Sequence, residues 1–185
     1  MIKGGDVIRV RSLCILLVVG LTAAGSAAGA VNVVLQIDEV PGSSTLEGYR
    51  GAIDVLSFSW GASNPGASRG SGAGASRPEF SEINFMKLMD SASPALLQAL
   101  TTGRVFAKAT VTLLVPTGGS MIASSTIELR GVSVTSQQLS GSSETPTESI
   151  SLRFDQVKWE VCSSDDTGAP AGCQTVTWNV AKNTP

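Results

Sequence analysis

Residues 48–60 read Gly-Tyr-Arg-Gly-Ala-Ile-Asp-Val-Leu-Ser-Phe-Ser-Trp, and this stretch decides the fold class. Its second half is rich in β-branched and aromatic residues and is bracketed by glycine and proline, which predicts a strand. Apolar side chains alternate between its two faces, with Leu56, Phe58 and Trp60 on one and Ile53 and Val55 on the other. Because neither face is strongly polar, we expect cover on both, as in a closed barrel with a helix or a neighbouring subunit against its wall.

The period of two continues on either side of this stretch. Further strands are predicted at residues 31–38, 79–87, 105–115, 122–135, 149–161 and 175–181. In two of them the apolar residues change phase, at Gly131 and near Asp155, and a β-bulge at Gly131 is one way to accommodate the change. Seven or eight strands with short polar links favour a mainly β fold, an antiparallel β-barrel.

One short helix is predicted between these strands. Ser93 is a good N-cap, Pro94 suits the first helical position, and Gly103 is placed to end the helix. A leucine stripe, formed by Leu96, Leu97 and Leu100, indicates that the helix lies on the flank of the barrel.

Residues 1–30 have the pattern of a secretory signal peptide. A basic start with Lys3, Arg9 and Arg11 precedes an apolar core and a run of small residues, and cleavage after Ala28 or Ala30 fits the small-x-small rule. The apolar core is too short to span a bilayer comfortably, and Cys14 has no lipobox before it, so a retained anchor and a lipoprotein are the weaker interpretations. We therefore expect an exported protein, periplasmic or extracellular, with no membrane association after cleavage.

The mature chain, residues 31–185, has the length of one domain and a modest acidic charge. Residues 1–30 hold three of the 13 basic and one of the 15 acidic residues, which leaves a formal charge of −4 on the remainder. Phosphate binding needs clustered Lys or Arg, and no basic run exists, so the sequence argues against a nucleic-acid partner.

Cys162 and Cys173 are the only cysteines of the mature chain. An even count in an exported protein predicts one disulfide, here at the base of a loop between two strands. A metal site is the poorer alternative, because the chain has no histidine and two thiols provide half a zinc site at best.

The stretch 61–76 holds only small and polar residues and is expected to form a long, mobile loop. Within it, residues 66–70 match the Gly-x-Ser-x-Gly nucleophile elbow around Ser68. That motif requires a preceding strand, a following helix and a histidine base, none of which the sequence offers. Asp165 and Asp166 are adjacent acids between turn signals, typical of a solvated loop tip. We predict no enzyme activity, no catalytic residue and no cofactor.

Two other residue sets leave alternatives open. The three tryptophans could form a ligand-stacking platform, but aromatic residues on strands are more often core or subunit contacts. Scattered arginines could line a lumen or pair with Glu128 and Glu148; these are Arg50, Arg104, Arg130 and Arg153.

Several stretches together resemble the haemolysin-coregulated protein (Hcp) family, which forms the inner tube of type VI secretion systems. They are residues 48–61, residues 85–97 (Phe-Met-Lys-Leu-Met-Asp-Ser-Ala-Ser-Pro-Ala-Leu-Leu), residues 147–152 (Thr-Glu-Ser-Ile-Ser-Leu), residues 158–160 (Lys-Trp-Glu) and residues 178–180 (Trp-Asn-Val). Their order and spacing match the family over nearly all of residues 31–183.

This resemblance implies a barrel with a flanking helix, assembled as a hexameric ring that stacks into a tube. It also implies a contractile sheath, a spike protein at the tip and small effectors in the lumen as partners. The loop after the second strand helps rings to stack in the family, and here it holds the candidate stacking residues Asn64, Pro65, Arg69 and Arg77. The signal peptide and the cysteine pair depart from the cytoplasmic loading that the family normally uses.

The leading hypothesis is therefore a self-assembling structural protein, an exported Hcp-like ring or tube component. The second is a secreted monomeric β-barrel that kept the fold as a binding or adhesion module. An enzyme is the third, because the nucleophile, base and metal ligands that it would need are missing from the sequence.

Overall fold

The computed structural model describes residues 32–65, 77–117, 119–141, 144–164 and 170–185, and the predicted signal peptide lies outside them. The described part is mainly β with one α-helix, as the sequence predicts. Its elements in chain order are β1 (Asn32–Ile37), β2 (Ile53–Ser59), β3 (Ala62–Ser63), β4 (Glu79–Phe80), β5 (Ile83–Leu88), α1 (Ser93–Thr102), β6 (Val105–Thr117), β7 (Ser120–Ser140), β8 (Thr147–Arg153), β9 (Gln156–Ser164) and β10 (Pro170–Asn179).

Six antiparallel strands close into a barrel. They follow the order β7, β6, β1, β2, β5, β8, and β8 pairs again with β7 to complete the circle. The predicted antiparallel β-barrel is thereby confirmed, and closure leaves these six strands without a free sheet edge where they pair.

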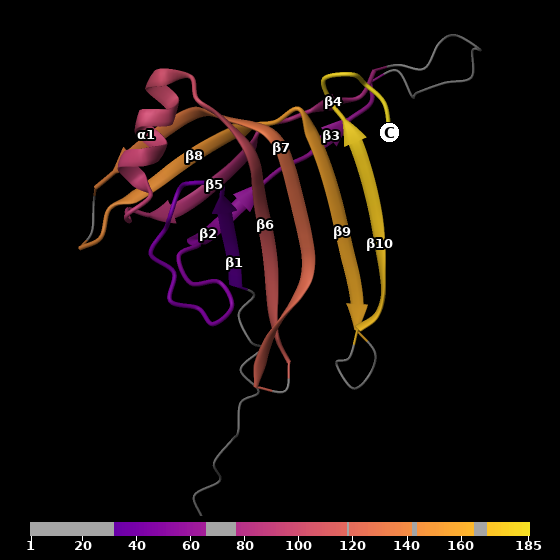
Figure 1. The fold of residues 1–185 in the computed structure, drawn as a ribbon, viewed down its shortest axis with the longest axis horizontal. Helices are drawn as coiled ribbons and strands as arrows, with labels where there is room; N and C mark the ends of the chain where they lie inside the picture. Colours follow the sequence, from indigo (N-terminus) through magenta and orange to yellow (C-terminus); the bar gives the residue numbers. More distant parts are fainter. Residues whose placement is uncertain (1–31, 66–76, 118, 142–143, 165–169) are drawn as a thin grey trace, which may run out of the picture.

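Strand β7 is long enough to pair with two strands along one edge while β6 covers the other. Its first half pairs with β9, with Arg130 opposite Gln156, and its second half pairs with β8, with Ser133 opposite Arg153. Because β9 leaves the barrel where β8 ends, the β9–β10 hairpin extends the wall beyond the closed part as a two-stranded flap (Figure 1).

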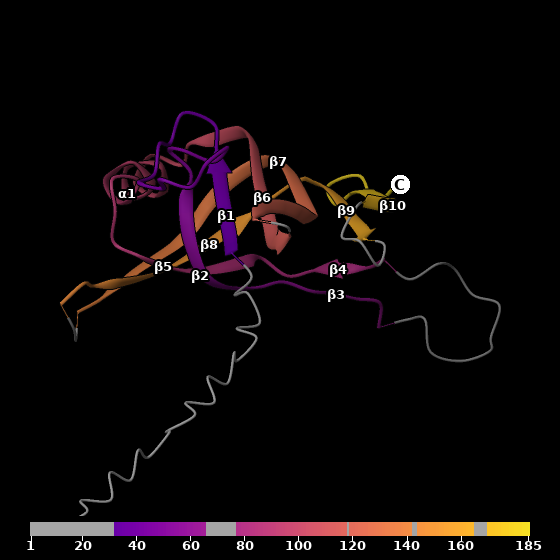
Figure 2. The same ribbon diagram turned by 90° about the horizontal axis from the view of Figure 1, so that it is seen from below.

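The barrel is filled by apolar side chains, and α1 packs on its flank. Leu96 and Ala99 of α1 join the same buried cluster as Phe85, Ile150 and Leu152 of the barrel strands. Leu100 is partly buried against this cluster, whereas Leu97 points away and is 50% exposed. Figure 2 shows the helix beside one end of the barrel, on the opposite side from the β9–β10 hairpin.

The predicted phase changes occur together at one corner of the wall. Leu129 and Val132, on either side of Gly131, are both in the core, and so are Phe154 and Val157, on either side of Asp155. Gly131 has φ of 63°, and the Asp155 amide donates to the carbonyl oxygen of Arg130 at 2.9 Å. The pairing of β6 with β7 keeps its register across Gly131, so the left-handed glycine bends the wall without the predicted bulge there.

The opening stretch differs from its prediction in two ways. Residues 48–52 form turns with Gly48 and Gly51 at positive φ, and the strand begins only at Ile53. A register shift between Val55 and Ser57 then breaks the alternation. As a result Ile53, Val55, Phe58 and Trp60 all contact the main core, and Leu56 is exposed.

Other expected boundaries also move. Strand β7 continues to Ser140, so residues 136–140 are not part of a polar link. Ala62 and Ser63 pair with Phe80 and Glu79 as β3 and β4, so the expected loop begins as a paired stem. Ser93 is the first residue of α1 and not its side-chain cap, because its hydroxyl is engaged with the barrel.

Candidate functional site: apolar surfaces for assembly

The hairpin presents an apolar surface that the chain itself leaves partly uncovered. Trp159, Val161 and Val176, named here the hairpin surface, are 41%, 42% and 56% exposed. Val176 lies directly opposite Trp159 in the pairing of β9 with β10, so the three side chains share one face. Val176 therefore does not point into the core of the single chain.

The indole of Trp159 is held in a defined position. Its Nε1 donates to the Ser125 hydroxyl at 2.9 Å, and its ring centroid lies 5.9 Å from that of Trp60 in an edge-on arrangement. Trp60 and Trp178 both stack on Phe80, with ring centroids 6.3 and 6.5 Å apart. The tryptophans thus join one aromatic cluster at the root of the hairpin, which fits a role in packing and in subunit contact.

A second apolar surface lies on the outside of β2 and β5. Leu56, Met86 and Leu88, named here the wall surface, are 59%, 38% and 43% exposed. The register shift after Val55 turns Leu56 outward next to Met86, which lies opposite Ser57. Beside Leu56 runs a groove of about 380 Å³ between β1, β2 and the loop at residues 44–46, with Val33 and Leu46 on its sides.

The two surfaces lie on different sides of the molecule. The hairpin extends from β7, whereas β2 and β5 are on the far side of the barrel from it (Figures 1 and 2). Neither surface can cover the other within one chain. Contact between the hairpin surface of one copy and the wall surface of the next would be heterologous, the type of contact that generates rings.

A buried ionic cluster fixes α1 to the barrel. Lys87 is 1% exposed; its Nζ donates to Glu148 Oε2 at 2.6 Å and lies 2.8 Å from Asp90 Oδ1 in a second ion pair. The Ser93 hydroxyl donates to the same Glu148 oxygen at 2.7 Å, and Gln137 Nε2 donates to the other at 3.2 Å. Residues of β5, β8, β7 and α1 therefore meet in one network, which the sequence analysis missed.

Electrostatics keep the central carboxylate ionised. Burial is the largest single influence on the pKa of Glu148 and raises it, but hydrogen bonds from Lys87 and Ser93 and the Lys87 charge together outweigh it, so the pKa lies below its ordinary value. On the outer wall, burial likewise raises the pKa of Glu128, but Arg130 and Lys108 lower it by more. The pKa of Glu128 therefore also lies below its ordinary value. Of the two alternatives left open for the arginines, Arg130 follows the pairing one and lies 2.7 Å from Glu128, whereas Glu148 pairs with a lysine instead of an arginine.

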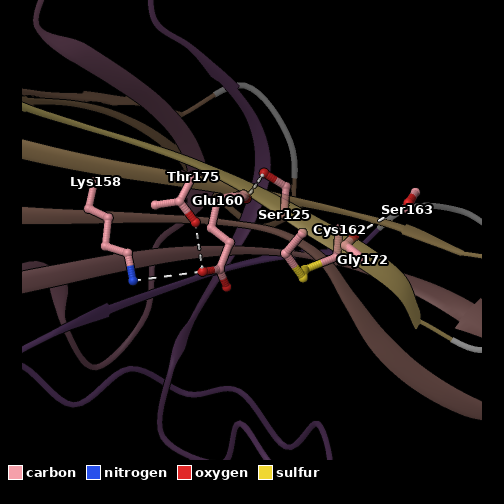
Figure 3. The surroundings of a disulfide bond; sticks show 8 residues. Ser125, Lys158, Glu160, Cys162, Ser163, Gly172 and Thr175 are labelled. Atoms are coloured by element: carbon pink, nitrogen blue, oxygen red, sulfur yellow. Dashed lines mark hydrogen bonds and ion pairs between the residues drawn. A yellow bond between two sulfur atoms is a disulfide. The ribbon is translucent and has the colours of Figure 1, made fainter.

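The predicted disulfide joins Cys162 to Cys173, which lie opposite each other near the end of the hairpin (Figure 3). Of the candidate stacking residues, Asn64 and Pro65 are exposed directly after β3. Arg77 is exposed before β4, and its guanidinium donates to the carbonyl oxygens of Val180 and Ala181 at 3.3 and 3.5 Å. Arg69, Ser68, Asp165 and Asp166 lie outside the described residues.

The described part is a closed barrel with a flanking helix and a two-stranded flap, and its grouped exposed apolar residues are of the kind that mark interaction sites. The sequence model of the family described as "Type VI secretion system effector, Hcp" matches residues 34–161. The chain belongs to this Hcp family. Membership confirms the predicted resemblance and the prediction that the chain is no enzyme, because the family is a structural one.

Solved structures agree with the family assignment. One described as a type six secretion system protein is 28% identical with a TM-score of 0.77, over 84% of this chain and 99% of that one. Hcp1 from Salmonella typhimurium is 22% identical with a TM-score of 0.69, over 84% and 98%. The secreted protein Hcp3 from Pseudomonas aeruginosa is 16% identical with a TM-score of 0.59, over 81% and 99%. At these identities the last two structures show the fold alone.

A search of the curated proteins found no match. Among the described residues, the helix is neither long nor apolar enough to cross a bilayer.

Proposed function

We propose that this chain is a tube subunit of a type VI-type secretion apparatus, which closes into a hexameric ring through its hairpin and wall surfaces. The observation that carries the proposal is the pair of apolar surfaces on opposite sides of one rigid barrel. Scattered exposed apolar residues are normal on a soluble protein, but grouped ones mark interaction sites. A head-to-tail contact satisfies both surfaces of every subunit once the ring closes.

In this arrangement the neighbour supplies cover that the chain lacks. Val176 and Trp159 of one subunit would approach Leu56 and Met86 of the next, and the groove beside Leu56 would accept the protruding side chains. Rings would then stack through the segment after β3, where Asn64, Pro65 and Arg77 are exposed. Family membership supports the sheath, the spike protein and small effectors as partners of the resulting tube.

Two single substitutions separate ring closure from other modes of assembly. Leu56→Asp disables the wall surface and Val176→Asp disables the hairpin surface, and each alone should yield monomers in a mass measurement. Mixed together, they retain one intact hairpin surface and one intact wall surface, so they should form a heterodimer that cannot close. Thr177→Asp serves as the matched control, since it lies opposite Lys158 on the polar face of the hairpin and should leave rings intact.

Electron microscopy of the unmodified protein completes the test. Hexameric rings, disrupted by both apolar substitutions and kept by the control, would support the proposal. Monomers over the micromolar range would overturn it and favour the secreted binding or adhesion module. Deletion of residues 66–75 should preserve rings but weaken stacking, and monomers in that variant would instead place the segment in the ring contact.

We further propose that the protein is exported by the predicted signal peptide at residues 1–30 and forms its disulfide outside the cytoplasm. The cross-strand cysteine pair supports this proposal, because disulfides persist in oxidising compartments. The isolated periplasmic protein should begin after Ala28 or Ala30 and resist thiol labelling. An unprocessed, freely labelled protein confined to the cytoplasm would exclude this route.

A further inference from the structure

The polar face of the hairpin brings a carboxylate next to the disulfide. Glu160 precedes Cys162 by two residues on β9 and therefore shares its face, and Cys173 lies directly opposite on β10. One carboxylate oxygen and the two sulfur atoms all lie within 4.8 Å of one another. Figure 3 shows the Glu160 side chain beside Cys162, between Lys158 and the disulfide.

We propose that reduction of the disulfide turns this face into a binding site for a zinc-type divalent ion, held by Cys162, Cys173 and Glu160. The mature chain, residues 31–185, offers only two thiols, half of a zinc site, and the fold adds the third donor. Two thiolates and a carboxylate suit a borderline-soft cation such as Zn²⁺, with water as the fourth ligand. This inference stands apart from ring assembly and does not require it.

The strand pairing holds the two sulfurs at the spacing that such an ion needs. Two sulfur ligands at 2.3 Å from tetrahedral zinc are about 3.8 Å apart. The Cα atoms of Cys162 and Cys173 are 4.0 Å apart, and the pairing continues from them toward Asn179 without a register shift. Reduction therefore frees the sulfurs to separate by rotation of their side chains while the backbones remain side by side.

The third donor is free to approach. Glu160 is 37% exposed, and Thr175 donates to its Oε2 at 3.1 Å while Lys158 Nζ lies 3.7 Å from the same oxygen. These contacts keep the carboxylate on the disulfide face without enclosing it. Cys173 is itself exposed, so both a reductant and an ion can reach the sulfurs from solvent.

The chemistry balances in two steps. Two molecules of a thiol reductant deliver two electrons and two protons to the disulfide, leave as their own disulfide, and yield the Cys162 and Cys173 thiols. The ion then displaces both thiol protons to solvent as each sulfur bonds to it. Metal binding and the disulfide are thus mutually exclusive states of one face.

Cobalt provides a spectroscopic test. Purified protein carrying Cys14→Ser, which removes the other cysteine of the chain, is reduced, freed of reductant without oxygen, and titrated with Co²⁺. We expect thiolate-to-cobalt charge-transfer absorption that saturates at one ion per chain, is displaced by Zn²⁺, and is absent from the oxidised protein. Glu160→Gln should weaken cobalt binding at least tenfold, whereas Thr175→Val, which removes only the hydroxyl beside Glu160, should change it less than threefold.

Three results of the metal titrations would overturn the proposal. They are the absence of charge-transfer absorption in reduced protein whose circular dichroism is unchanged, saturation at one ion per two chains, and equal affinity in the Glu160→Gln variant. Loss of hairpin structure on reduction would also overturn it, because the third donor would then lose its place beside the thiols.

Discussion

Replacing Glu148 by glutamine removes the central charge of the buried cluster at almost constant volume. Lys87 would lose the negative charge of its 2.6 Å partner but keep Asp90 at 2.8 Å, so its own charge would not be left wholly unpaired. Breaking a buried ion pair destabilises by about 3–5 kcal/mol, and the remaining partner places this case near the lower limit, at about 3 kcal/mol.

The Glu148→Gln substitution also leaves the hydrogen bonds around position 148 poorly matched in donors and acceptors. If the new amide oxygen accepts from Lys87 and Ser93, its NH₂ group faces Gln137 Nε2, another donor. Rotating the Gln137 amide would relieve that clash and use its Oε1, a buried atom with no partner in the described structure. The rotation would, however, sacrifice the 3.2 Å bond from Gln137 Nε2 to the Ser93 carbonyl oxygen.

Urea unfolding followed by circular dichroism measures the effect. With a slope of about 2 kcal/mol/M for a domain of this size, a loss of about 3 kcal/mol lowers the midpoint by about 1.5 M. Glu128→Gln is the matched control, since its partners lie on the outer wall, and should cost at most about 1 kcal/mol. All variants are compared at one concentration and in one assembly state, because association adds apparent stability.

A double substitution decides whether the charge or the shape matters. Lys87→Met with Glu148→Leu removes both buried charges together, and we expect it to be more stable than either single variant. A midpoint shift below about 0.5 M for Glu148→Gln, equivalent to less than about 1 kcal/mol, would refute the reasoning. Strict additivity in the double variant would refute it as well.

Three further outcomes follow from the same contacts. Because the folded pKa values of Glu148 and Glu128 lie below the ordinary carboxyl value, stability should be full above about pH 4.5 and decline as the pH falls further. The decline should be shallower in the Glu148→Gln variant. An unchanged pH profile of the urea midpoint in that variant would contradict this expectation. Gly131→Ala would place a Cβ 2.4 Å from Asp155 Oδ2, at a residue whose φ is 63°, and should lower the free energy of unfolding in urea by about 2 kcal/mol. Adding Asp155→Ala should restore about half of that loss. Full retention of stability in the single variant would show that this corner of the wall tolerates a side chain. Cys162→Ser with Cys173→Ser should lower the free energy of unfolding by about 3 kcal/mol, because the disulfide closes a loop with a sequence separation of 11. A reductant should bring the unmodified protein to the same free energy of unfolding. A urea midpoint that does not respond to the reductant would mean that the cross-link is not formed.

The sequence predicts the strands well because their side chains are sorted by period two, and it predicts the disulfide because the count and the flanking strands agree. It predicts a barrel, but not which strands close it. That depends on β7 pairing with β9 along one half and with β8 along the other, a choice made by register between distant segments. The outward turn of Leu56 was likewise hidden, since the register shift exists only relative to β5.

The buried cluster, in contrast, left a readable signal. Lys87 continues the inward phase of Ile83 and Phe85, and Glu148 continues that of Ile150 and Leu152. A lysine and a glutamate in core phase on two strands, with opposite charges, predict a buried pair because neither is tolerated alone inside a barrel. The leucine stripe of the helix indicates apolar docking alone, and the ionic contact beneath it is therefore easily overlooked.

The hairpin explains why the cross-link lies where it does. Barrel strands have partners on both sides. Within the part of the chain that the structure describes, β10 pairs with β9 alone, and β9 pairs with β7 only through residues 125–130 of that strand. At its root the hairpin is supported by the aromatic cluster around Trp178, whereas toward its end Val161 and Val176 remain exposed. A disulfide between Cys162 and Cys173 restrains this poorly supported end and preserves the spacing of the exposed side chains. The same element can therefore present a preformed apolar face without the barrel contacts that stabilise the rest of the wall.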